Sequence, residues 1–258
     1  MNHAETKRSG RLNLVGIGPG DPELVTLKAI RILEDADAIV APMASARGTS
    51  NALETARSVV DLSEKEMVQV HFPMKKVHLS EKKHQDVRAG WDKAAEQVMK
   101  RLSQGMNVAF PTIGDPSLYS TAYYLLATLK QKNPDLEARI IPGISAMSSC
   151  SCLVHSPLAL GDDLFCVIPA TFDDQRIEEA LLRFDSITLM KVHSCLARIV
   201  AILERTGLLE KAILVERCGL QGERIFPDVR DALNQKIHYF STILVRKRGL
   251  EILQERIP

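Results

Sequence analysis

A run of glycines follows the first apolar stretch of the chain and ends in an aspartate. Leu12–Gly16 has the pattern of a buried strand. Gly18 and Gly20 lead from it into Asp21 and Pro22. Because glycine has no Cβ, such a loop lets the main chain approach a small ligand closely. The dinucleotide-binding pattern G-x-G-x-x-G would need its third glycine where Asp21 stands. We therefore predict a ligand-facing loop of another kind.

A second loop of similar composition follows another apolar stretch. Residues 106–110 read as a buried strand, and Gly114, Asp115 and Pro116 come shortly after it. Ligands collect at the carboxyl ends of parallel strands, so the two loops predict one shared ligand site. Each loop alone is also compatible with simple turn chemistry, because Asp-Pro often starts a helix. Asp115 thus has two interpretations, a partner for polar ligand groups or a helix cap.

A third loop of small residues follows a short strand predicted at 139–141. It reads Pro142-Gly143-Ile144-Ser145-Ala146, and small residues continue through Ser151. Such a run is typical of a helix that packs against a ligand or against another stretch of main chain.

The order of apolar stretches indicates an α/β fold in two domains. A strand, a helix over 23–35 and a second strand over 36–41 make a βαβ unit, which predicts a mainly parallel sheet. Later strands come more often and with shorter connections, which predicts a mixed sheet. We expect an N-terminal α/β domain over 11–117 and a C-terminal α/β domain over 118–258.

Composition excludes several classes of protein. The 258 residues carry a net charge of +1, whereas a general nucleic-acid binder is usually clearly basic. No apolar run approaches the roughly 18 residues of a membrane span, and the first ten residues lack the apolar core of a signal peptide. We therefore expect a cytoplasmic protein with no membrane or nucleic-acid partner. The five cysteines and seven histidines show no metal-binding spacing, so we expect free thiols and no protein-held metal.

A basic stretch follows residue 73. It contains Lys75, Lys76 and His78, with further lysines at 82 and 83. It has two interpretations, a solvated helix face or a rim that attracts a polyanionic small molecule.

Three motifs, in this order and at this spacing, resemble those of the tetrapyrrole methylases, which are S-adenosylmethionine enzymes. They are the stretch from Val15 to Asp21, the Gly114–Pro116 loop and the stretch from Ile141 to Ala146. Within this family the chain most resembles the C20-methyltransferases that act on precorrin-2 or cobalt-factor II in cobalamin biosynthesis. That likeness is carried by Phe72-Pro73-Met74, Ile168-Pro169-Ala170-Thr171 and Leu189-Met190-Lys191-Val192.

The resemblance implies two α/β domains with S-adenosyl-L-methionine in a cleft between them, S-adenosyl-L-homocysteine as the product, and a homodimer. By motif, the implied donor-binding positions are Pro19, Ile113, Gly114, Asp115, Leu118, Ser145 and Ala146. By pattern alone, they extend to Thr121, Lys191, Val192, Cys218, Gly219, Thr242 and Ile243. The anionic tetrapyrrole would lie near Gly18, Gly20 and Asp21, with its carboxylates paired to Lys75 and Lys76.

The chain departs from the family pattern after the second predicted strand. Relatives that make the first two methylations of this ring have an aspartate after the second strand, where this chain has Pro42, so no catalytic base is assigned. The sequence does not report whether the substrate carries cobalt. The alternatives are a methylase that acts at another ring position and a nicotinamide-dependent oxidoreductase built on the first glycine loop.

Overall fold

The computed structural model describes residues 10–43, 50–73 and 85–249. The chain divides into two compact units, Met1–Ser145 and Ala146–Pro258. Each contains one five-stranded sheet.

The sheet of the first unit is entirely parallel, as predicted. Its strands lie in the order β3-β2-β4-β1-β5, and every neighbouring pair runs in the same direction. The strands are β1 (Leu12–Gly16), β2 (Ala38–Met43), β3 (Glu66–His71), β4 (Val108–Thr112) and β5 (Ala138–Ile141). Carboxyl ends of parallel strands meet at one edge, so the loops after β1, β4 and β5 leave the sheet together.

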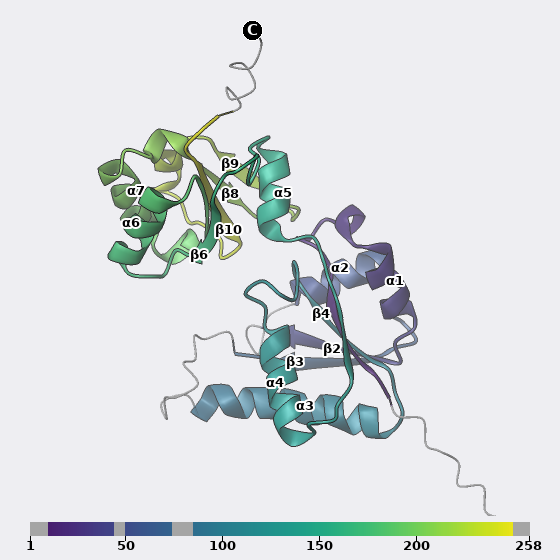
Figure 1. Ribbon diagram of the computed structural model, residues 1–258. Coiled ribbons are helices and arrows are strands. Elements are labelled where there is room, and N and C mark those ends of the chain that lie inside the picture. The colour runs from purple at the N-terminus through teal and green to yellow at the C-terminus, as the bar shows by residue number, and fades with distance from the viewer. Residues whose placement is uncertain (1–9, 44–49, 74–84, 250–258) are drawn as a thin grey trace, which may run out of the picture. The chain divides into compact units, whose positions relative to one another are not determined.

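Four helices cover the two faces of this sheet, α1 and α2 on one side and α3 and α4 on the other (Figure 1). The helices are α1 (Leu27–Glu34), α2 (Asn51–Val59), α3 (Gln85–Ser103) and α4 (Ala122–Lys132). Alternation along β1 supplies both cores, because Leu14 packs with the α3 and α4 side and Val15 with the α1 and α2 side. Both residues are fully buried.

The helix predicted over 23–35 is two elements. A 3-10 turn, η1 (Pro22–Leu24), comes first and α1 begins only at Leu27. Each of these two elements has its own N-terminal cap. The Asp21 carboxylate accepts a hydrogen bond from the Glu23 amide at 2.9 Å at the start of η1, and the Thr26 hydroxyl accepts one from the Ala29 amide at 3.2 Å at the start of α1. The second cap, which the apolar pattern does not show, separates the two elements.

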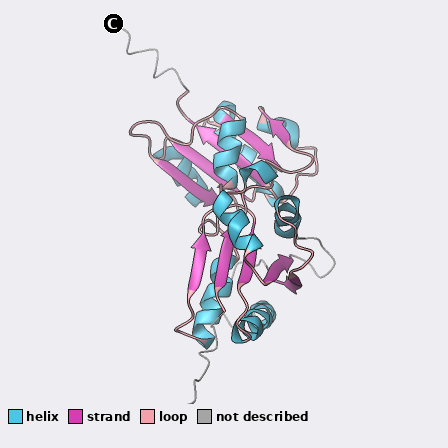
Figure 2. Ribbon diagram, turned by 90° about the vertical axis from the view of Figure 1, so that its right-hand side faces the viewer, coloured by secondary structure: helices cyan, strands magenta, loops and turns pink. Residues whose placement is uncertain are grey.

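The second unit has a mixed sheet, again as predicted, in the order β6-β7-β10-β8-β9. Of its neighbouring pairs, β6 with β7 is parallel, and the pairs that involve β8, β9 and β10 are antiparallel. Figure 2 shows the strands of both sheets as magenta arrows. The strands are β6 (Phe165–Pro169), β7 (Ser186–Met190), β8 (Ala212–Glu216), β9 (Arg224–Phe226) and β10 (Ser241–Arg246).

Helices α6 and α7 pack on one face of the second sheet, and α5 packs on the other (Figure 1). The helices are α5 (Ala146–Leu153), α6 (Asp174–Arg183) and α7 (Leu196–Arg205), with 3-10 turns η3 (Val192–Ser194), η4 (Leu209–Lys211) and η5 (Val229–Ala232). Within the described ranges, no helix combines the length and apolar character needed to cross a membrane.

The division between the units differs from the boundary expected between residues 117 and 118. The chain returns to the first sheet after α4, because β5 pairs with β1 in the register Leu12↔Ala138 to Val15↔Ile141. Helix α4 also packs against α3 of the first unit. The boundary therefore falls at Ser145 and Ala146, after the third predicted loop.

Glycines without room for a Cβ bring the loops after β1, β4 and β5 together. A Cβ on Gly16 would lie 2.7 Å from the Gly143 nitrogen and 2.8 Å from the Gly114 oxygen. A Cβ on Gly143 would overlap that same Gly114 oxygen. The loops are also bonded directly, since the Gly114 amide donates to the Gly18 oxygen at 2.7 Å.

One buried ion pair fastens the loop before β6 to the end of β10. The guanidinium of Arg246 lies 2.7 Å from the Asp163 carboxylate, and both side chains are less than 10% exposed. Asp163 also accepts the Leu160 amide at 2.8 Å, and Arg246 donates to the Pro157 oxygen at 3.3 Å. Removal of either partner would leave a charge buried and unpaired.

We expect Gly143→Ala to lower the free energy of unfolding by about 2 kcal/mol, because an overpacked contact must push two loops apart. Gly161→Ala is the control: its φ of +54° is unfavourable for alanine, but no atom lies within 4 Å of the new Cβ. Urea denaturation of both variants measures the difference. Equal losses would contradict a steric requirement at Gly143.

We expect Asp163→Ala to lower the free energy of unfolding by about 3 kcal/mol, since Arg246 would remain charged and buried. The matched control is Glu54→Ala, which breaks an exposed pair with Arg57 whose side chains are about half exposed. That change should cost no more than about 0.5 kcal/mol. Similar denaturation midpoints for the two variants would show that the buried pair contributes little.

Candidate functional site

The first predicted loop is a buried, hydrogen-bonded structure. Gly18 and Gly20 have φ values of +76° and +139°, which favour glycine, and both are buried together with Pro19. Gly18 pairs with Gly114 in an isolated antiparallel bridge. The Asp21 carboxylate caps η1. The loop therefore presents mainly main-chain atoms, and Asp21 has a local structural role.

Asp115 connects the second loop to the third. One carboxylate oxygen accepts the Ser117 amide at 2.8 Å and the Ser117 hydroxyl, and the other accepts the Gly143 amide at 2.9 Å. Burial alone would raise the pKa of Asp115, but the hydrogen bonds from Ser117 and Gly143 outweigh it and hold that pKa below its usual value. Asp115 is thus a charged acceptor that fixes two loops.

Asp115 does not cap the next helix, which was one of its two interpretations. Helix α4 begins at Ala122, and the Ala122 amide donates instead to the Ser120 hydroxyl at 3.1 Å. Ser120 lies in turn 3.0 Å from the hydroxyl of Thr112 at the end of β4. The sequence analysis missed Ser117 and Ser120. The pattern Asp-Pro-Ser, which favours a side-chain-bonded turn, could have indicated Ser117.

The other predicted positions of the first unit lie in or next to these loops. Ile113 and Leu118 are half-buried, and Gly114, Thr121 and Ser145 are buried. Tyr119, between Leu118 and the start of α4, has a φ of +51° and is 45% exposed. A non-glycine residue in this conformation is uncommon and marks a constrained turn. The structure therefore gathers the first-unit predictions at the carboxyl edge of the parallel sheet.

In the second unit, the predicted positions gather at one edge of the mixed sheet. That edge holds the carboxyl ends of β7 and β8 and the amino end of β10, because β10 runs antiparallel to both neighbours. Lys191 and Val192 follow β7, Cys218 and Gly219 follow β8, and Thr242 lies opposite Met190. Apart from Thr121, which lies in the first unit, the residues that the sequence predicted from pattern alone thus lie along one edge of this sheet.

Two of these positions offer a ligand little side-chain surface. Val192 and Ile243 are fully buried in the apolar core beneath α6 and α7. Only their main-chain atoms remain as candidate contacts. Ala146, the first residue of α5, and Lys191, with a φ of +63°, are half-buried.

A buried carboxylate that the sequence analysis missed ends β8. Glu216 is 2% exposed. Its carboxylate accepts a hydrogen bond from the guanidinium of Arg224 at 2.5 Å and another from the main-chain amide of His238. Burial would raise the pKa of Glu216, but the hydrogen bonds from Arg224 and His238 hold it below its usual value. Arg217 follows with a φ of +53°. Glu216 thus fixes the turn that carries Cys218 and Gly219.

The predicted substrate residues Lys75 and Lys76 lie outside the described residues, and so does His78.

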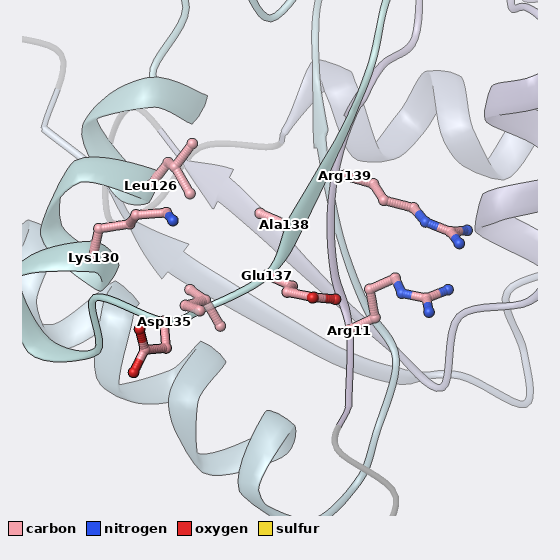
Figure 3. Close-up of a pocket in the computed structure, with 8 residues that line it drawn as sticks. Arg11, Leu126, Lys130, Asp135, Glu137, Ala138 and Arg139 are labelled. Atoms are coloured by element: carbon pink, nitrogen blue, oxygen red, sulfur yellow. The ribbon is translucent and has the colours of Figure 1, made fainter.

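A pocket of about 400 Å³ lies at the opposite end of the first sheet, where β1 and β5 begin (Figure 3). In this view Arg11 and Arg139 lie on one side of the pocket, and Lys130 of α4 and Asp135 lie on the other. Glu137 adds a second carboxylate, so the lining has mixed charge. This pocket is remote from the carboxyl ends of the strands and is separate from the predicted ligand edge.

The chain is similar in sequence to three methyltransferases of cobalamin biosynthesis. It is 34% identical to the cobalt-precorrin-2 C(20)-methyltransferase of Salmonella typhimurium over 93% of this chain and 98% of that relative. It is 32% identical to the precorrin-2 C(20)-methyltransferase of Sinorhizobium sp, over 92% and 95% of the two chains. It is 32% identical to a probable cobalt-precorrin-2 C(20)-methyltransferase of Methanocaldococcus jannaschii, over 85% and 88%.

Solved structures share the fold. The methyltransferase CobJ superposes with a TM-score of 0.67 at 21% identity, over 92% of this chain and 94% of that one. Uroporphyrin-III C-methyltransferase from Thermus thermophilus, crystallised with S-adenosylhomocysteine, superposes with a TM-score of 0.62 at 20% identity, over 92% and 97%.

A family model covers nearly all of the described chain. The model of tetrapyrrole (corrin/porphyrin) methylases matches residues 11–233, which include all three predicted loops, the whole first sheet and the second sheet except β10. The nicotinamide-dependent oxidoreductase, an alternative raised by the first glycine loop, finds no support in these relatives. The chain belongs to the tetrapyrrole (corrin/porphyrin) methylases.

Proposed function

We propose that this chain transfers a methyl group from S-adenosyl-L-methionine to C20 of precorrin-2 or its cobalt-containing counterpart, cobalt-factor II, in cobalamin biosynthesis. The supporting observation is the identity of 32–34% to relatives named for this reaction, over at least 85% of this chain. The solved structures, at about 20% identity, support the fold alone.

The first unit fits the methyl donor at the three strand-end loops. Glycines remove the Cβ atoms where the loops converge, so main-chain atoms can reach a ligand without intervening side chains. Ile113 and Leu118 add half-buried apolar surface. The proposed donor-binding positions of this unit are Pro19, Ile113, Gly114, Asp115, Leu118, Thr121 and Ser145.

The second unit, taken by itself, contributes a further set of proposed donor-binding positions. These are Ala146, Lys191, Val192, Cys218, Gly219, Thr242 and Ile243, with Val192 and Ile243 restricted to main-chain contacts. Gly219 has a φ of +74°, and its amide donates to the Glu223 carboxylate at 2.8 Å. This contact holds the turn in one conformation before a ligand arrives.

The chemistry requires positioning more than side-chain catalysis. S-adenosylmethionine supplies an activated methyl group that an electron-rich ring carbon accepts, after which that carbon must lose a proton. The protein holds the two reactants in line and excludes water. Loops fixed by Asp115 and by glycine contacts suit this task, because they lose little freedom when the donor binds. No residue is assigned as the base.

The tetrapyrrole is proposed to approach the loop that contains Gly18, Gly20 and Asp21, where main-chain atoms predominate. Its carboxylates are proposed to pair with Lys75 and Lys76. Asp21 would contribute through the cap that it forms on η1 rather than by attracting an anionic ligand. Homodimerisation, which the resemblance implies, and a cytoplasmic location, which the composition of the sequence favours, also stay predictions.

The proposed function is tested by anaerobic turnover of precorrin-2, with and without cobalt, in the presence of S-adenosylmethionine carrying a ¹³C-methyl group. A single labelled methyl group at C20 in the NMR spectrum supports the proposal. Comparison of the two substrates decides the metal state. A label at another ring carbon would identify a methylase of different regiochemistry.

We expect Asp115→Ala to weaken binding of S-adenosylhomocysteine about tenfold, because two loops lose a charged acceptor worth about 1.5–3 kcal/mol. Isothermal titration calorimetry measures this change. The matched control is Asp61→Ala, since Asp61 accepts the Ser63 amide at 2.9 Å in a similar turn just before β3. Unchanged affinity in Asp115→Ala would remove this residue from the donor site.

We expect Lys75→Ala combined with Lys76→Ala to raise KM for the tetrapyrrole severalfold, because two cations that pair with its carboxylates are lost. The affinity for S-adenosylhomocysteine should not change. Steady-state kinetics and calorimetry measure the two effects separately. A parallel loss in both would mean that these lysines act on the structure rather than on the substrate.

A further inference from the structure

Two cysteine side chains face each other on the α5 side of the second sheet. Cys150 lies in the middle of α5, and Cys218 lies in the turn after β8. Both belong to one apolar cluster with Val215 and Leu244, and they are 1% and 8% exposed. Ser149, the neighbour of Cys150, has its hydroxyl 3.2 Å from the Cys218 sulfur. The helix and the turn are therefore in contact through these side chains.

The two thiols lie in the same buried cluster and differ in acidity. The pKa of Cys150 is raised, first by the hydrogen bond with Cys218 and then by burial. The pKa of Cys218 is lowered, because its interactions with Cys150 and Ser149 outweigh burial, which raises it. Of the two thiols, Cys218 therefore loses its proton more readily, and the thiolate is the form of cysteine that reacts with a peroxide.

The three remaining cysteines lack such a partner thiol among the contacts of the described residues. All five are free, Cys152 is exposed, and Cys166 and Cys195 are half-buried. Burial raises the pKa of Cys166 to about 11, which keeps that thiol protonated at neutral pH. Cys195 lies 3.3 Å from the Ala170 oxygen, to which its thiol donates. These residues serve as internal controls for reactivity.

We propose that Cys150 and Cys218 form a redox modification site, which a peroxide converts to a disulfide and which, once oxidised, lowers the affinity for the methyl donor.

The chemistry needs hydrogen peroxide or an organic peroxide as the oxidant. The Cys218 thiolate attacks one peroxide oxygen, the O–O bond breaks, and Cys218 becomes a sulfenic acid while hydroxide leaves. The Cys150 sulfur then attacks the Cys218 sulfur, and the sulfenic oxygen leaves as water. Overall, two thiols and one hydrogen peroxide give one disulfide and two waters. The sulfurs must move from hydrogen-bond contact to about 2.0 Å apart.

The effect on the donor rests on the function proposed above. Cys218 and Gly219 are proposed donor-binding positions, and α5 begins at Ala146, another such position. A covalent bond between α5 and this turn would fix their spacing at the disulfide distance instead of the present contact. Binding and oxidation are then linked, so a bound donor should make the disulfide less favourable at equilibrium by the same factor.

The modification itself is tested on the full chain by thiol counting and peptide mapping. Five thiols should titrate in the reduced, unfolded chain, and three should remain after treatment with a small excess of hydrogen peroxide. Trypsin should release Cys218–Arg224 joined to the peptide that contains Cys150. Dithiothreitol should separate the two peptides. A chain that keeps five thiols, or that gains oxygen without a peptide link, would overturn the proposal.

The tryptic peptide that contains Cys150 also contains Cys152 and Cys166, so variants are needed to show which of these cysteines is linked to Cys218. The Cys150→Ala variant should lose the link and retain binding of S-adenosylhomocysteine, whereas Cys152→Ser should keep the link. Persistence of the link in Cys150→Ala would show that another cysteine is the partner, which overturns the assignment. The circular dichroism spectrum and the thermal midpoint of each variant confirm that it is folded.

Calorimetry then tests the coupling to the donor. We expect the affinity of the oxidised chain for S-adenosylhomocysteine to fall at least tenfold and to recover with dithiothreitol, and Cys150→Ala to show no such fall after peroxide. A disulfide that leaves the affinity unchanged would overturn the proposed coupling. A reduced chain that binds no S-adenosylhomocysteine would instead contradict the proposed function, while the peptide map still decides the disulfide.

Discussion

The absence of room for a Cβ where three loops converge is the constraint on which the first unit depends. Gly16, Gly114 and Gly143 bring main-chain atoms so close that a side chain on the first or third would overlap the neighbouring loop. Hydrogen bonds from Gly114 to Gly18 and from Gly143 to Asp115 complete the junction. The edge of the parallel sheet is therefore shaped by close packing of main chain, which reduces the conformational freedom that the loops lose when a ligand binds.

In the second unit, charged side chains rather than close glycine contacts hold the strand-end turns in place. Its strand-end turns are held by carboxylates that accept main-chain amides, as Glu216 does from His238 and Glu223 does from Gly219. Two arginines pair with buried carboxylates in this unit: Arg224 with Glu216, and Arg246 with Asp163. Both units thus prepare their loops in advance, one by steric fit and the other by paired polar groups.

The sequence predicted the two sheets and their types because strand periodicity, glycine loops and short connections are local signals. It could not predict that β5 returns to the first sheet, since pairing between distant strands leaves no local pattern, and the expected boundary was therefore early. It identified Asp115 but not its partners Ser117 and Gly143, because hydrogen bonds depend on the folded positions of main-chain amides. Ile243 was expected at the site, yet strand alternation turns its side chain into the core.

The place of β1 within its sheet has a consequence for synthesis of the chain. β1 precedes the other described strands in the sequence, yet its two neighbours, β4 and β5, begin only at Val108 and Ala138. Before β4 is made, the amides and carbonyls of β1 have no ladder on either side, and until β5 follows, one side stays unpaired. Long-range parallel pairing of this kind forms slowly and leaves nascent edges open to wrong partners. The first sheet is therefore complete only after nearly all residues of the first unit have been synthesised. We expect this unit to fold in one late step rather than gradually during synthesis.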